Sequence, residues 1–334
     1  MFDKQAILDK LQADDFEPFI WAQKGIQQTL LSYFLPYNPF VSHQNLIKVP
    51  LSDGDNIVIA LNVPIKSTPP KRIALLMHGL SGSYLSKYMI RMTQRLTQLG
   101  YLVVRMNLRG TGPGKDYAKK LYHGGMSTDV SSVLAYLAQY YPNLPVTVIG
   151  FSLGANIALK LAGEPQLSHG NMDSLVAVSP PMDLYACVQL LSKPPNKFLD
   201  KHFAKELVTE VTAMHNHLKL PLPNFPKEIS VYEFDEIYTA PHNGFTSAID
   251  YYSQSSALHY LHAIKIPTFI LCAKNDPLIF IRRYKQIPHK ENFDILLTDN
   301  GGHVGWVSNM NRNGMRWMDD VIAKWIVWME GHCK

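Results

Sequence analysis

The chain has 334 residues, of which 46% are hydrophobic and 18% are charged, and its formal net charge is +5. These proportions are typical of a globular protein with a sizeable core, either two domains or one large α/β domain with an insertion. Lysine and arginine are scattered, without a basic run or basic–aromatic interleaving, so nucleic-acid binding has little support.

The cysteine and histidine patterns predict neither a disulfide framework nor a metal site. The three cysteines, Cys187, Cys272 and Cys333, are few, odd in number and far apart, which favours a reducing compartment. His215 and His217 lie close in sequence, but positions i and i+2 do not share a helix face. We therefore expect no metal and no cofactor.

The N-terminal residues give no targeting or spanning signal. Residues 1–7 lack the basic start and apolar block of a signal peptide, and the apolar stretch 16–35 is broken by charged and amide side chains. We expect a cytoplasmic protein without a transmembrane segment, and leave peripheral membrane contact open.

The first part of the chain is predicted to form a helical arm, residues 1–40, followed by a hairpin. Apolar and polar residues alternate over 46–63, around the turn Asp53-Gly54-Asp55. From residue 72 the pattern changes to buried strands separated by helices. The expected strands are 72–77, 101–106, 146–149 and 175–178, and the expected helices are 88–98 and 128–139, the latter capped by Ser127 or Thr128.

The alternation is interrupted over residues 181–264, which have helical periodicity and no buried strand run. Strands resume at 266–273 and 293–298, and a helix over 317–329 closes the chain. Near-continuous apolar strands between helices predict a mostly parallel sheet with helices on both faces. We expect a core formed by 41–180 and 265–334, with 181–264 inserted as a helical cap.

The most informative motif is Gly150-Phe151-Ser152-Leu153-Gly154, between an apolar strand and a helical segment. Strand, tight turn and helix form the setting of a nucleophile elbow. A Cβ at Gly150 or Gly154 would crowd the neighbouring backbone, and the turn would leave the Ser152 hydroxyl free above the sheet. The alternative is an ordinary turn, because this short motif is common by chance.

A serine nucleophile needs a base, and the base needs a group that orients it. Asp276 and His303 follow the last two expected strands, in the chain order Ser, acid, His. Asp276 could instead be an Asx-turn residue before proline, and His303 a turn histidine between glycines. Asp183 is the main rival for the acid and Asp299 a weaker one.

The oxyanion of an acyl-transfer reaction needs hydrogen-bond donors. We predict the backbone N–H of Leu153, directly after the serine, and the N–H of Leu80 in the loop after strand 72–77. His78 in the same loop is interpreted as a hydrogen-bonding brace rather than a base.

Several motifs in order carry a resemblance over most of the chain. The sequence resembles the YheT-like group of α/β-hydrolases, relatives of the ABHD esterases and lipases. The matching segments are Phe16-Glu17-Pro18, Gln28-Thr29-Leu30, His78-Gly79-Leu80-Ser81-Gly82, Asn107-Leu108-Arg109-Gly110, Leu121-Tyr122-His123-Gly124-Gly125, the elbow, Phe234-Asp235, Thr239-Ala240-Pro241-His242-Asn243-Gly244-Phe245, Asp250-Tyr251-Tyr252, Ser255-Ser256-Ala257-Leu258 and Ala273-Lys274-Asn275-Asp276-Pro277.

The resemblance implies an α/β-hydrolase fold, a triad of Ser152, Asp276 and His303, and carboxylic ester hydrolysis through an acyl-enzyme. Ala155 and Asn275 depart from the family pattern without removing a catalytic atom. The expected partner is a small-molecule ester. The composition is compatible with a lipid-like ester. The alternatives are an acyltransferase or thioesterase with the same triad, or a non-catalytic lipid-binding protein.

Overall fold

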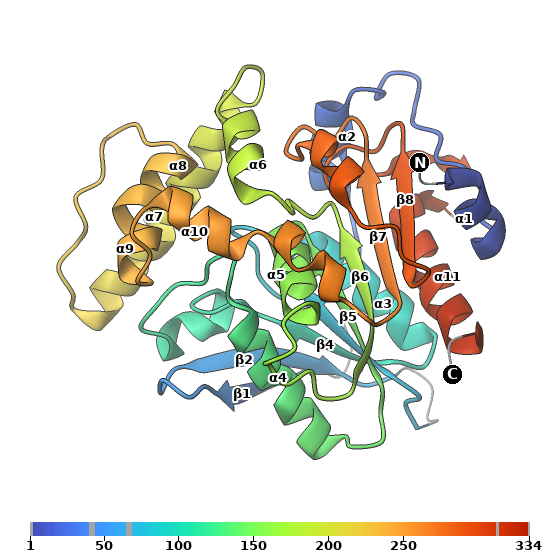
Figure 1. Ribbon diagram of the computed structural model, residues 1–334, viewed down its shortest axis with the longest axis horizontal. Coiled ribbons are helices and arrows are strands. Elements are labelled where there is room, and N and C mark those ends of the chain that lie inside the picture. The colour runs from blue at the N-terminus through green and yellow to red at the C-terminus, as the bar shows by residue number, and fades with distance from the viewer. Residues whose placement is uncertain (1–2, 40–43, 65–68, 312–313, 333–334) are drawn as a thin grey trace.

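The computed structural model describes residues 3–39, 44–64, 69–311 and 314–332. Its centre is an eight-stranded sheet in the order β1-β2-β4-β3-β5-β6-β7-β8 (Figure 1). Strands β1 and β2 are antiparallel to their neighbours, and the strands from β4 to β8 are parallel. The bounds are Gln44–Pro50, Asn56–Asn62, Ile73–Met77, Leu102–Met106, Val146–Phe151, Met172–Val178, Thr268–Ala273 and Phe293–Thr298 for β1 to β8.

Both faces of the sheet are buried, because successive side chains of a strand point to opposite faces. In β3, Ile73 and Leu75 join one apolar cluster, and Ala74 and Leu76 join the other. Helices α4 (Ser127–Tyr140) and α5 (Leu153–Ala162) cover the first face. Helices α1 (Lys4–Leu11), α3 (Lys87–Gln98) and α11 (Trp317–His332) cover the second. The predicted mostly parallel sheet with helices on both faces is confirmed.

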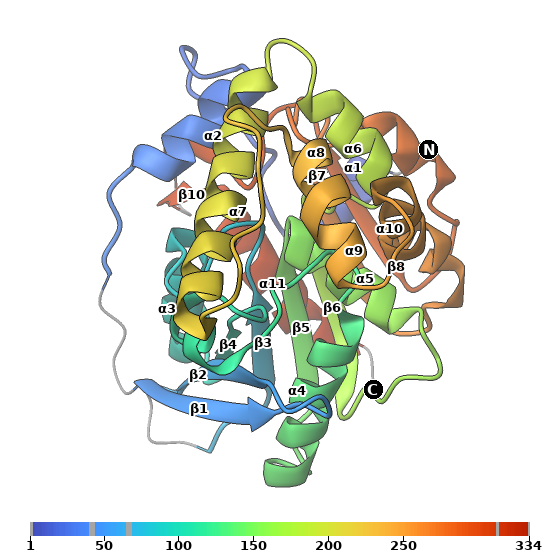
Figure 2. The same ribbon diagram turned by 90° about the vertical axis from the view of Figure 1, so that its left-hand side faces the viewer.

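The chain between β6 and β7 is helical and carries α6 to α10. These helices gather on one side of the sheet, opposite α11 in Figure 1, and face the viewer in Figure 2. The division into an arm of 1–40, a core of 41–180 and 265–334, and a cap of 181–264 is our proposal. The bounds are Leu184–Leu191, Lys197–Leu218, Val231–Phe234, Ala240–His242 and Ala248–Ser255 for α6 to α10.

A buried ionic network fastens the β1–β2 hairpin to the core. The Arg109 guanidinium donates two hydrogen bonds to Asp129 on α4, at 2.9 and 2.6 Å, and one to Asp55 at 2.9 Å. It also reaches Asp53 in the hairpin turn. Arg109, in the motif Asn107-Leu108-Arg109-Gly110, therefore uses its guanidinium nitrogens for structural contacts.

One local prediction is wrong, and one pair of short strands was not predicted. The predicted N-cap of α4, Ser127 or Thr128, is wrong: Met126 occupies the cap position and no side chain caps the helix. The Ser127 hydroxyl is buried and contacts Lys160 of α5 and Glu164 just after that helix, so tertiary contacts take the place of the cap. The unpredicted strands are β9 (Val307–Asn311) and β10 (Gly314–Arg316), which pair antiparallel just before α11.

Candidate active site

The elbow between β5 and α5 holds Ser152 in a strained backbone conformation. Its φ is 52° and its ψ is −120°, a region that non-glycine residues rarely adopt. A Cβ at Gly150 would lie 2.5 Å from the Cα of Ala155, and one at Gly154 would lie 2.5 Å from the carbonyl oxygen of His78. Both glycines therefore permit the close backbone approach that forms the turn.

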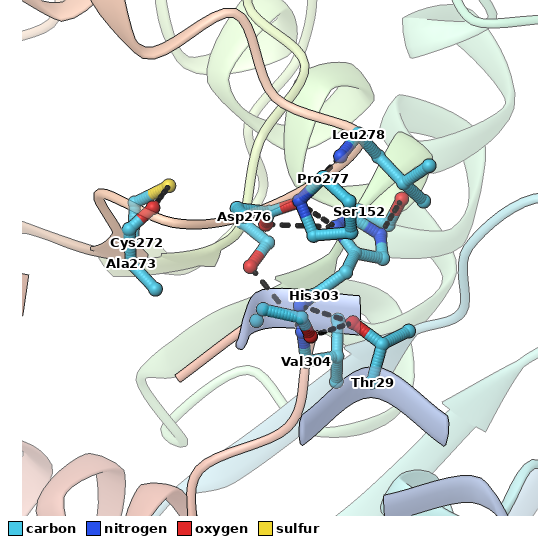
Figure 3. Close-up of polar contacts among 12 residues, drawn as sticks. Thr29, Ser152, Cys272, Ala273, Asp276, Pro277, Leu278, His303 and Val304 are labelled. Atoms are coloured by element: carbon cyan, nitrogen blue, oxygen red, sulfur yellow. Dashed lines mark hydrogen bonds and ion pairs between the residues drawn. The ribbon is translucent and has the colours of Figure 1, made fainter. Parts of the chain in front are cut away.

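Three polar side chains from distant parts of the sequence meet at this turn (Figure 3). The Ser152 Oγ lies 2.8 Å from His303 Nε2, and His303 Nδ1 lies 2.9 Å from Asp276 Oδ2. Ser152 follows β5, Asp276 follows β7 and His303 follows β8. These strands are parallel, so the three residues lie at the same edge of the sheet.

Asp276 is buried and makes the contacts of both alternative interpretations, the histidine partner and the Asx turn. Its Oδ1 accepts a hydrogen bond from the Leu278 N–H at 2.9 Å, which forms an Asx turn, and both carboxylate oxygens face His303. The structure places the two rivals elsewhere. Asp183 caps α6 through the Ala186 N–H and pairs with Arg283, while Asp299 is exposed and pairs with Lys274.

The loop after β3 presents Leu80 between two anchored residues. The Gly79 N–H donates to the Tyr88 hydroxyl at 3.0 Å, and the Ser81 N–H donates to the Tyr122 hydroxyl at 2.7 Å. Within the described residues, the N–H groups of Leu80 and Leu153 donate to no protein acceptor. These two groups are therefore available as donors beside Ser152.

His78 stabilises this loop through hydrogen bonds of its imidazole ring. Its Nδ1–H donates to the Gly79 carbonyl at 2.7 Å, and its Nε2 accepts from the Leu108 N–H at 3.0 Å. The side chain is fully buried, and burial lowers its pKa to about 4. A neutral imidazole with both nitrogens engaged fits a structural role.

Residues 75–305 match the family described as the alpha/beta hydrolase fold. The chain belongs to this family. The matched range includes Ser152, Asp276 and His303, and leaves helix α2 (Gly25–Phe34) outside it.

Among its relatives, the putative esterase YheT of Escherichia coli K12 is 30% identical over 291 residues, which cover 84% of this chain and 83% of that protein. Human phospholipase ABHD3 is 26% identical over 339 residues, covering 96% of this chain and 80% of that protein. The chain is thus a YheT-like, ABHD-related α/β hydrolase, in a group of esterase- and lipase-like hydrolases.

Solved structures share the fold at low sequence identity. The 2,6-dihydroxy-pseudo-oxynicotine hydrolase has a TM-score of 0.58 at 16% identity, covering 91% of this chain and 71% of that one. The Pyrococcus furiosus esterase Pf2001 has a TM-score of 0.54 at 17% identity, covering 86% of this chain and 91% of that one.

Two cavities of this α/β hydrolase meet at Ser152. The cap cavity, about 120 Å³, lies under the cap and its lining includes Leu184, Val188, Leu207 and Phe234. The arm cavity, about 500 Å³, lies between α2, the loop after β3 and α7, and its lining includes Thr29, Ser32, Ser81, Lys87, Glu206 and His303. Ser152 and Leu80 line both cavities, whereas His303 lines the arm cavity alone.

The cap cavity also contains buried titratable groups. Burial, with smaller effects of nearby cations, lowers the pKa of His123 to about 3. Burial raises the pKa of Asp235 to about 6, although its carboxylate accepts a hydrogen bond from the Tyr252 hydroxyl at 2.6 Å. The direction of both shifts indicates a poorly solvated interior, because burial disfavours the charged form of each group.

The remaining sequence predictions concern metals, cysteines and membranes. Among the described residues, no three His, Cys, Asp or Glu side chains cluster in a way that could hold a metal ion. His215 contacts the Pro221 carbonyl and the Tyr238 hydroxyl, and Cys187 and Cys272 are buried thiols. Cys333 lies outside the described residues. In the described part of the chain, no helix combines the length and apolar character needed to cross a bilayer.

Sequence reasoning missed the contribution of α2 to this site. The Thr29 hydroxyl accepts a hydrogen bond from the His303 N–H at 2.8 Å, across 274 positions of sequence. The segment Gln28-Thr29-Leu30 resembles the family's N-terminal segment, and this resemblance assigns Thr29 no role. A single polar contact between such distant residues leaves no periodic signal by which it could have been found.

Proposed function

We propose that the protein is a serine carboxylic ester hydrolase that works through an acyl-enzyme. The observation that carries the proposal is the hydrogen-bonded chain from Ser152 Oγ through His303 to Asp276, with spacings of 2.8 and 2.9 Å. Both distances lie in the range at which a base can take a proton from a neighbouring hydroxyl.

In the first half-reaction, Ser152 Oγ attacks the ester carbonyl carbon while His303 Nε2 takes the hydroxyl proton. The N–H groups of Leu80 and Leu153 donate to the oxyanion that forms. Collapse of the tetrahedral intermediate breaks the bond to the alcohol oxygen, and His303 returns the proton to that oxygen. Asp276 accepts from His303 Nδ1–H throughout, which fixes the tautomer and stabilises the imidazolium.

In the second half-reaction, water takes the place of the alcohol. His303 removes a proton from water, the hydroxide attacks the acyl carbon, and the second tetrahedral intermediate collapses. Ser152 leaves with the proton from His303, and the carboxylic acid product is released. Every proton transfer passes through one imidazole, so loss of either of its hydrogen-bonding partners affects both halves.

The two cavities suggest how an ester would lie. The leaving alcohol oxygen must come within hydrogen-bond reach of His303, and His303 lines only the arm cavity. The alcohol portion therefore extends into the arm cavity, and the acyl chain extends into the more apolar cap cavity. The printed names of relatives, a phospholipase and a monoacylglycerol lipase among them, agree with a lipid-like ester of this kind.

The proposal is tested by hydrolysis of p-nitrophenyl esters of increasing acyl length. The wild type is expected to hydrolyse them, and Ser152→Ala to lose roughly 10⁴- to 10⁶-fold in kcat, because it lacks the attacking oxygen. Ser132→Ala is the matched control, since that hydroxyl donates only to the Thr128 carbonyl on α4. A Ser152→Ala variant that keeps wild-type kcat would overturn the proposal.

The acyltransferase alternative is distinguished in the same assay. Adding a primary alcohol to the reaction lets the acyl-enzyme partition between water and the alcohol. We expect free acid to be the main product at low alcohol concentration. Predominant transfer to the alcohol at low concentration would instead assign an acyltransferase with the same side chains.

A further inference from the structure

The loop that carries His303 adopts an unusual backbone conformation. Gly301 and Gly302 have φ of 148° and 63°, and Val304 and Trp306 have φ of 51° and 47°. Positive φ in a β-branched and a bulky residue is unfavourable and persists only where other contacts hold it. The contacts that hold this loop therefore also determine the position of His303.

Helix α2 supplies a hydrogen bond to His303 itself. The Thr29 hydroxyl has one hydrogen, which it donates to the Gly25 carbonyl at 2.8 Å. Its lone pairs therefore face outward, and one accepts the N–H of His303 at 2.8 Å. Figure 3 shows Thr29 on its helix directly beside His303 and Val304.

Two further residues of α2 hold the rest of the loop. Gln28 is fully buried and pairs with both polar backbone groups of Val307, accepting from its N–H at 2.8 Å and donating to its carbonyl at 3.1 Å. The Ser32 hydroxyl donates to the Val304 carbonyl at 3.2 Å. The loop is thus attached to α2 at three residues, 303, 304 and 307.

The same helix touches the loop that carries Asp276. A Cβ on Gly25 would lie 1.7 Å from the Asn275 carbonyl oxygen, so the helix backbone lies directly against this loop. The Asn275 amide donates to the Gln23 carbonyl at 3.0 Å and accepts from the Gly302 N–H at 3.1 Å. The acid loop and the histidine loop are therefore joined to each other and to the start of α2.

We infer that Thr29 is a positioning residue, and that α2 sets the place of His303 between Ser152 and Asp276. Helix α2 lies outside the residues 75–305 that match the hydrolase family, so the core alone does not supply this support. The inference rests on the proposed function, because it assigns Thr29 a role in the same reaction.

The test compares Thr29→Val with Thr29→Ser. Valine keeps the shape and removes the acceptor, whereas serine keeps the hydroxyl. We expect Thr29→Val to lower kcat by about 10- to 100-fold with KM within about twofold, because small displacements of a catalytic group are costly in rate. Thr29→Ser is expected to restore most of the wild-type kcat. The second-order rate of inactivation by a fluorophosphonate should fall in parallel.

The control is Thr209→Val on α7, an exposed threonine whose hydroxyl makes the same bond to the carbonyl four residues earlier, at 2.8 Å from Lys205 O. It is expected to keep wild-type kcat. Should Thr29→Val fail to fold, Thr29→Ala removes the same acceptor with a residue of higher helix propensity and is expected to give the same loss.

The outcomes distinguish the positioning role of Thr29 from the proposed hydrolase function. A folded valine or alanine variant with kcat within twofold of wild type would overturn the role of Thr29. A serine variant as impaired as the valine variant would also overturn it, since the hydroxyl would not be the important group. Retained activity in Ser152→Ala would instead overturn the proposed function, whatever Thr29 does.

Discussion

The cap cavity and the arm cavity share Ser152 but differ in the chemistry of their walls. Leucine, valine and aromatic side chains dominate the cap cavity, whereas the arm cavity also includes several hydroxyl and charged side chains, among them Thr29, Ser32, Lys87 and Glu206. The cap cavity is formed largely by helices inserted between β6 and β7, and the arm cavity is closed by α2 from the N-terminal segment.

Because their linings differ, the two cavities are suited to different parts of an ester. The apolar side can bury a hydrocarbon chain, at about 0.8 kcal/mol for each methylene removed from water. The polar side contains the imidazole that must protonate a leaving oxygen, and its other polar groups can hydrogen-bond an alcohol portion. The helices between β6 and β7 and the N-terminal helix α2 would then determine acyl and alcohol preference independently.

The largest expected effect concerns Asp276, whose carboxylate contacts His303 beside the serine that both cavities share. Asp276→Asn should lower kcat by roughly 10³- to 10⁴-fold, because an amide can hold His303 in the wrong tautomer. Asp183→Asn is the matched control and should stay within about threefold, since asparagine also caps helices well. Steady-state hydrolysis of one p-nitrophenyl ester measures both. The reverse ranking would assign the acid to Asp183.

A second prediction tests whether the cap cavity is as poorly solvated as its lining suggests. Burial raises the pKa of Asp235 to about 6 from its ordinary value near 4, so the folded state holds the proton to higher pH than the unfolded state. The stability contributed by the neutral carboxyl is therefore full below about pH 4 and is lost as pH rises to about 6.

Asp235→Asn removes this dependence, because the amide stays neutral. The variant should gain stability relative to wild type as pH rises from 4 to 7, by up to about 3 kcal/mol for a shift of this size. Urea denaturation at a series of pH values measures the difference. A difference independent of pH would mean that the Asp235 carboxyl is well solvated, and the contrast between the cavities would weaken.

The third prediction narrows the cap cavity. Val188→Phe should reduce kcat/KM for long-chain esters by about 10-fold relative to short-chain ones, since lost methylene burial costs 1–3 kcal/mol. Val327→Phe on α11 is the control, because Val327 is 46% exposed and lines neither cavity. An equal loss for all chain lengths would place the acyl chain elsewhere.

The smallest expected effect lies in the arm cavity. There Arg91 pairs with Asp319 and Lys87 donates to the Tyr33 carbonyl, whereas in the described part of the chain no ion pair reaches Glu206. Glu206→Gln should lower the preference for a cationic over a neutral alcohol by about fivefold, which corresponds to roughly 1 kcal/mol for a solvated charge pair. The measurement compares kcat/KM for two esters of the same acid, one with a cationic alcohol and one with a neutral alcohol. An unchanged preference would place the alcohol out of reach of Glu206.

Local sequence patterns were sufficient to predict the sheet and the elbow, because both depend on short-range rules. Buried parallel strands appear as apolar runs, and the turn needs a glycine at position 150, where a Cβ would lie 2.5 Å from the Cα of Ala155. The positions of Asp276 and His303 after their strands could be predicted from chain order alone. Their catalytic roles stay predictions until activity is measured.

Features that depend on tertiary packing could not be predicted. Ser127 is of a residue type that favours the N-cap, yet its hydroxyl pairs with Glu164, which follows α5. The bond between Thr29 and His303 joins residues 274 positions apart, and the two cavities arise where three segments of the chain converge. Local propensity and periodicity carry no information about contacts between residues so far apart in the sequence.

The most direct test of the account is the site at which a fluorophosphonate probe reacts. The folded wild-type protein should gain the mass of one phosphonyl group, and peptide mapping should locate it on Ser152, with Ser152→Ala remaining unmodified. A folded wild type that gains no mass, or a modification on another residue, would contradict the claim that the Ser152 hydroxyl, activated by His303, forms the covalent intermediate.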